Sequence, residues 1–153
     1  MNVYENLASL GLTLPEVGAC QGVFVRAKPF GANLLYVSGS GSETPARSTY
    51  GKLGAAVSLE EGKKAAEDTV LNILTAIESA LGDLNRVTSF VKLLVFVSSS
   101  PDFCQQPAVA NGASELLVRI FGEEIGCPAR SAIGVAVLPG DISVETECLI
   151  EYQ

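Results

Sequence analysis

The strongest structural signal in this chain of 153 residues is PARSAIGVAVLPGDISVETE, residues 128–147. Its first part, Ser131–Leu138, is apolar and predicts a strand, and Pro139-Gly140-Asp141 predicts a turn. From Ile142 to Ile150 apolar and polar residues alternate, which is typical of a strand with one buried face. The stretch therefore predicts two strands that belong to one sheet.

Two helices and a further strand precede this stretch. Ser58-Leu59-Glu60-Glu61 is a capping box, and the apolar residues behind it recur every three or four positions up to Leu81. Arg86–Val97 is rich in Val, Leu and Phe, which predicts a largely buried strand. A second helix begins near Pro107 and ends at Gly122. Its apolar stripe consists of Val109, Ala113, Leu116, Leu117 and Ile120.

The first third of the chain predicts a short helix and a hairpin. Residues 2–10 form the helix, which Asn2 caps and Gly11 ends. Val23–Ala27 and Leu34–Val37 are the two strands of the hairpin, because Gly and Asn residues lie between them. The element order is then β-β-α-β-α-β-β behind one extra helix. Two helices on one face of a mixed sheet form an α+β architecture.

Composition favours one domain over residues 1–153. The chain is 48% apolar and 18% charged, which suits a sizeable core and excludes a disordered protein. No apolar run reaches the roughly 18–20 residues that span a bilayer. Residues 1–11 carry no basic residue, unlike a signal or transit peptide. We therefore expect a cytoplasmic protein that does not bind membranes.

The charge balance and the lack of histidine limit the classes of function that the chain can have. Ten basic against seventeen acidic residues give a net charge of −7, the reverse of the usual balance in nucleic-acid binders. The chain has no histidine, which excludes Ser-His-Asp triads and histidine metal sites. Proton transfer near neutral pH then needs a carboxylate, a thiol, a Tyr, a Lys or a bound water. Cys20, Cys104, Cys127 and Cys148 are widely scattered, so we expect free, buried thiols and no bound metal.

Two charged residues near the final strands are candidates for chemistry. Arg130 directly precedes a predicted strand, where a rigid guanidinium can bind a carboxylate through two hydrogen bonds. A surface salt bridge is the alternative. Glu145 shares its strand face with Glu147 and Glu151. It either positions a water and relays a proton or belongs to an ordinary solvated face.

Two small-residue motifs also leave alternatives open. Ser38-Gly39-Ser40-Gly41-Ser42 follows a strand, where small residues let a ligand approach the backbone, or it is a flexible polar loop. Asn111-Gly112 interrupts the second helix pattern with two poor helix formers. Such a break marks either a site or close packing against a neighbour.

Together these features resemble the reactive intermediate deaminase family, also called YjgF-like. Residues 128–147 are similar to the family signature of Pro-Ala-Arg-Ser, a strand, Leu-Pro and then Glu-x-Glu. Residues 35–39, Leu-Tyr-Val-Ser-Gly, resemble the family's second strand and its Ser-Gly end. The resemblance covers about residues 15–153. Residues 111–123 are closer to a longer, less characterised branch of the family.

The resemblance implies a fold similar to chorismate mutase and a homotrimer whose sheets pack into a central barrel. Ligand sites would lie in the clefts between subunits. Deaminating members hydrolyse small 2-imino acids derived from enamines to 2-keto acids and ammonia, without a cofactor. By this resemblance Arg130 would hold the substrate carboxylate and Glu145 would position the attacking water. The residues implied to line the cleft are Ser38, Gly39, Asn111 and Ala132.

The chain departs from the deaminating members at three positions. Gly18-Ala19-Cys20 stands where they carry Gly-Pro-Tyr, Ser40 replaces a Gln, and Ala132 replaces a frequent Cys. A non-catalytic trimer that binds a small carboxylate metabolite is therefore the second hypothesis. An endoribonuclease, a label some members carry, is the third, and the acidic balance and absent histidine argue against it. Whether Cys20 takes over the role of the missing Tyr stays open.

Overall fold

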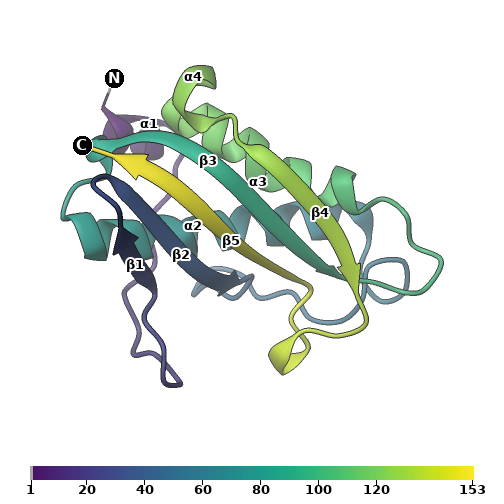
Figure 1. Ribbon diagram of the computed structural model, residues 1–153. Helices are drawn as coiled ribbons and strands as arrows, with labels where there is room; N and C mark the ends of the chain where they lie inside the picture. The colour runs from purple at the N-terminus through teal and green to yellow at the C-terminus, as the bar shows by residue number, and fades with distance from the viewer. Residues whose placement is uncertain (1) are drawn as a thin grey trace.

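The computed structural model describes residues 2–153, which form a five-stranded sheet with two long helices on one face (Figure 1). The strand order is β1-β2-β5-β3-β4, in which β3 and β4 are parallel and the other pairs antiparallel. This mixed sheet matches the expected α+β architecture. The strands are β1 Ala27–Phe30, β2 Leu34–Gly41, β3 Val87–Ser98, β4 Ala129–Val135 and β5 Val144–Tyr152. The helices are α1 Val3–Ser9, α2 Leu59–Leu81, α3 Gln106–Phe121 and α4 Glu123–Gly126, with 3-10 turns at Leu84–Arg86 and Pro139–Asp141.

The core lies between the sheet and the helices α2 and α3. Along β5 the side chains alternate as predicted, so that Val144, Thr146, Cys148 and Ile150 are buried against the helices. Glu145 and Glu147 point to the opposite face, which no other element within residues 2–153 covers (Figure 1). The chain therefore buries one face of its sheet and leaves the other open.

Local signals set the ends of both long helices. Ser58 and Glu61 form the predicted capping box at the start of α2, and Gly82 ends it in a left-handed conformation with φ 78°. Pro107 lies in the first turn of α3. A Cβ on Gly112 would collide with the carbonyl oxygen of Lys63 in α2. Of the two explanations for Gly112, close helix packing is therefore correct.

The predicted strand at Val23–Ala27 is wrong, because only Ala27 belongs to β1. The turn after Phe30 sets a register in which Ala27 pairs with Val37. Beyond that pair β2 bulges between Val37 and Ser40, and the ladder stops after one hydrogen bond of 2.8 Å from the N–H of Ser38 to the carbonyl oxygen of Arg26. The apolar side chains from Val23 to Val25 are exposed instead.

The strand predicted at Ser131–Leu138 is displaced toward the N-terminus, since β4 spans Ala129–Val135. Its only sheet partner among the described residues is β3, and the last pair is Ser98 with Val135. Where β3 ends, β4 has nothing further to pair with. Strand β4 is thus a half-exposed edge strand, and Arg130 lies inside it rather than just before it.

The N-terminal helix α1 is capped by Asn2 as predicted. The side-chain oxygen of Asn2 accepts a hydrogen bond from the N–H of Tyr4.

All four cysteines are free, but only Cys148 is buried, and burial raises the pKa of its thiol. The expectation of buried thiols is wrong for the other three, because they lie in loops. Among residues 2–153 no helix combines the length and apolar character needed to cross a membrane.

Candidate functional site

Arg130 is held in place by helix α3. Its Nη1 atom donates to Asn111 Oδ1 at 2.9 Å and to Ser114 Oγ at 3.0 Å. Its Nη2 atom donates to the carbonyl oxygen of Pro107 at 3.3 Å. No described residue forms a salt bridge with it, so the surface ion pair considered for Arg130 is absent from this part of the chain. The guanidinium is oriented but not neutralised, as an anion-binding group requires.

Glu145 lies against the backbone of β2. It pairs with Gly41 across the two strands. A Cβ atom on Gly39 would collide with Glu145 Oε1 and would lie 3.0 Å from its Cδ atom. Only a glycine therefore leaves room for the Glu145 side chain in this position. The bulge in β2 at residues 37–40 supplies that glycine at the required point.

The carboxyl of Glu145 is half-buried and accepts no hydrogen bond from residues 2–153. Burial raises its pKa above the ordinary value, and the neighbouring carboxylate of Glu147 raises it further. Glu147 instead accepts a hydrogen bond of 2.6 Å from the hydroxyl of Tyr36. Glu145 is therefore the less stabilised of the two carboxylates and the better placed to accept a proton.

Arg130 and Glu145 do not meet within one chain. Arg130 pairs with buried Leu93 and points to the helix side, whereas Glu145 pairs with Phe96 and points to the open side. Strand β3 lies between them, which separates their backbones by roughly 10 Å across the sheet. One small ligand cannot contact both residues of the same chain.

The other predicted site residues divide between these two places. Asn111 contacts Arg130 directly and Gly112 permits close helix packing, while α3 continues unbroken through both residues. Ala132 lies on the same face of β4 as Arg130, opposite Val95. Ser38 precedes Gly39 in β2, and its hydroxyl donates to the carbonyl oxygen of Val25 at 2.6 Å. Sequence reasoning did not find Ser114, because a serine one turn after Asn111 gives no separate signal.

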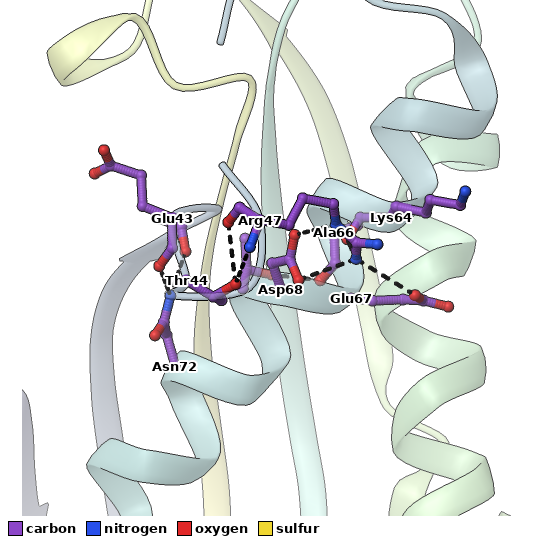
Figure 2. Close-up of polar contacts among 10 residues, drawn as sticks. Glu43, Thr44, Arg47, Lys64, Ala66, Glu67, Asp68 and Asn72 are labelled. Atoms are coloured by element: carbon purple, nitrogen blue, oxygen red, sulfur yellow. Dashed lines mark hydrogen bonds and ion pairs between the residues drawn. The ribbon is translucent and has the colours of Figure 1, made fainter. Parts of the chain in front are cut away.

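The loop between β2 and α2 is fixed to α2 by two side chains (Figure 2). Asn72 donates to the carbonyl oxygens of Gly41 and Glu43 at 2.9 and 2.8 Å. Arg47 donates to Asp68 from Nε at 2.7 Å and from Nη2 at 3.0 Å. This pair was not predicted, although an aspartate on the buried face of a predicted helix needs a partner. These contacts hold the end of β2, which carries Gly39.

Metal-binding groups are sparse in the part of the chain that the structure describes. No group of three or more His, Cys, Asp or Glu side chains gathers there in a way that could hold an ion. The candidate site thus consists of a cation, a carboxylate, an amide and backbone groups.

The sequence and the structure match known proteins over nearly the whole chain. Residues 19–152 match the family model described as endoribonuclease L-PSP. Protein TCP17 of Trypanosoma cruzi is 43% identical over 150 residues, which covers 97% of this chain and 93% of that protein.

Two solved structures place the chain within this group. Atu1372 of Agrobacterium tumefaciens, a protein of unknown function, is 37% identical with a TM-score of 0.90, covering 99% of this chain and 92% of that one. The YjgF gene product of E. coli is 26% identical with a TM-score of 0.59, covering 92% of this chain and 94% of that one. The structural match is much closer to the first than to the second.

Proposed function

Because the chain belongs to the YjgF-like family described as endoribonuclease L-PSP, we propose that it hydrolyses small 2-imino acids to 2-keto acids and ammonia. The observation that carries the proposal is a pair of charged groups on β4 and β5, neither of which forms a salt bridge within residues 2–153. Arg130 is oriented by three oxygen atoms yet has no anionic partner among residues 2–153. Glu145 is half-buried with a raised pKa.

The reaction needs little more than these two groups. An iminium carbon beside a carboxylate is already electrophilic, so catalysis is mostly a matter of orientation. Arg130 binds the substrate carboxylate through its Nε–H and its remaining Nη2–H. Glu145 accepts a proton from a water molecule, whose oxygen forms a bond to the imine carbon. The carbon–nitrogen bond then breaks with protonation of nitrogen, so that iminium and water yield a ketone and ammonium.

We further propose that two copies of the chain build each site. Arg130, Asn111 and Ala132 of one copy face Glu145 and Gly39 of the next. The open sheet face supports this arrangement, because Ile133 and Tyr36 are 44% and 43% exposed there beside half-buried Phe96. A homotrimer with its sheets packed together buries this surface and repeats the site three times.

A second function is favoured by the departures in sequence. Exposed Cys20 stands near the place of the missing Tyr, and Ser40 replaces the family Gln. If these losses remove catalysis, the same site binds a small carboxylate metabolite without turnover. RNA cleavage is a weaker proposal, because the net charge is −7 and the chain has no histidine.

The test is imine hydrolysis by purified protein. An amino-acid dehydratase acting on Ser or Thr generates the imine in place, and keto-acid formation is followed above the spontaneous rate. We expect acceleration by the wild-type protein and none by Arg130→Ala, with the oligomer intact by light scattering. Carboxylate binding without acceleration supports the binding function instead. Acceleration that survives in Arg130→Ala refutes the assignment of Arg130, and a monomeric Arg130→Ala makes the residue structural.

A further inference from the structure

A second cleft lies between the N-terminal connector and the helices, away from Arg130 and Glu145. Its volume is about 490 Å³, within the range of small-molecule sites. Residues 11–15 form one wall, the loop at residues 44–47 forms another, and α2 and α3 form the floor. The apolar lining consists of Leu12, Leu14, Pro15, Pro45, Leu71 and Leu116. This cleft is independent of the proposed function.

Three charged side chains belong to the lining of the cleft, and Figure 2 shows them close together: Arg47, Glu67 and Asp68. Asp68 is 4% exposed and takes both strong hydrogen bonds of Arg47. Arg47 Nη2 also donates to the carbonyl oxygen of Lys64 at 2.8 Å. The positive charge of Arg47 is therefore matched by Asp68, and the lining carries a net charge of −1.

Glu67 is the second carboxylate and forms only a long ion pair. Its oxygen lies 3.8 Å from Arg47 Nη2, beyond hydrogen-bond distance, and Figure 2 shows it on the far side of Arg47 from the loop. Within residues 2–153 no donor forms a hydrogen bond to it. Its side chain is 37% exposed, so a bound molecule can reach it.

The two prolines of the lining contribute no backbone donor. The carbonyl oxygen of Pro15 accepts a hydrogen bond of 3.1 Å from the Thr75 hydroxyl, whereas that of Pro45 accepts none from residues 2–153. Arg47 retains two Nη1–H groups as the main alternative, and these would favour an anion. A ligand that suits most of the lining brings donors and a positive charge to Glu67 and an apolar body to the leucines.

We propose that this cleft is a second binding site, for a small molecule with an apolar body and a protonated primary amine. The amine donates to Glu67, and the body packs between Leu12, Leu71 and Leu116. Charge complementarity selects this class, since the cleft's own cation is already paired.

Hexylammonium is the probe, hexanol is its neutral counterpart and hexanoate its anionic counterpart. Binding is followed by NMR titration of the full chain. We expect saturable shifts confined to residues 11–15, 44–47 and the turn of α2 that carries Glu67. Hexylammonium should bind about fivefold more tightly than hexanoate, the ratio an accessible ion pair supports. Tighter binding of hexanoate would show that Arg47 Nη1 governs the cleft and would overturn the proposal.

Two variants and a control sharpen the test. Glu67→Gln keeps the shape of the side chain and should weaken hexylammonium about fivefold while leaving hexanol unchanged. Ala46→Phe fills the cleft from its exposed loop side and should abolish binding of all three probes. Glu115→Gln removes the same charge from an exposed position of α3 and should change nothing. Equal weakening by Glu67→Gln and Glu115→Gln would reduce the effect to net charge and refute a site at Glu67.

Discussion

Replacing Gly39 with alanine should displace the Glu145 carboxyl without touching Arg130. The new Cβ would overlap Glu145 Oε1 and would lie 3.0 Å from Cδ and 3.4 Å from Cγ. The carboxyl must then move by roughly 1 Å to restore van der Waals contact. A misplacement of that size costs about 10²-fold in rate when the group acts on the reacting atoms.

The assay is keto-acid formation from an imine generated in place, measured as kcat and KM. We expect kcat to fall about 10²-fold while KM changes little, because Arg130 still binds the substrate carboxylate. Off-rotamer strain in Glu145 should lower the free energy of unfolding by only about 1 kcal/mol. Ser40→Ala, on the same strand but pointing to the other face, is the control and should retain activity. A folded Gly39→Ala protein with wild-type kcat would refute a catalytic role for Glu145.

Three further changes probe the surroundings of the site. Glu147→Gln removes a like charge beside Glu145, so the pKa of Glu145 should fall and the rise of activity with pH should move to lower pH; a pH–rate profile that does not move would contradict this coupling. Arg130→Lys loses the fork geometry and should raise KM about tenfold with unchanged folding by circular dichroism, whereas an unchanged KM would mean that a point charge suffices. Gly112→Ala overlaps the Lys63 carbonyl and should destabilise the protein by about 1–3 kcal/mol in urea titrations, and wild-type stability would show that α2 and α3 can separate freely.

The helices and central strands could be predicted because their signals are local. The capping box at Ser58, the αL glycine at Gly82 and the alternation along β5 each determine a few residues in a row. The predicted strand at Val23–Ala27 is wrong because pairing at this point is not set locally. It depends on the turn after Phe30 and on a bulge in β2, and neither is encoded in the apolar residues themselves.

The residues of the candidate site could be predicted from the sequence, but their arrangement in space could not. Arg130 and Glu145 follow one another along the chain across a single turn, which favours placing them together. The structure inserts β3 between their strands and turns the two side chains to opposite faces. That outcome depends on strand order, which is set by long-range pairing, so no pattern within residues 128–147 contains it.

The central claim is that one copy supplies Arg130 and the next supplies Glu145. It is tested most directly by co-expressing Arg130→Ala and Glu145→Ala chains with different tags and assaying the mixed oligomers for imine hydrolysis. In a ring of three, every mixed oligomer contains one site of three that takes an intact Arg130 and an intact Glu145 from different chains. Each variant alone should be inactive and correctly assembled. Recovery of about a third of wild-type activity is the predicted result, and mixed oligomers as inactive as the single variants would contradict the account.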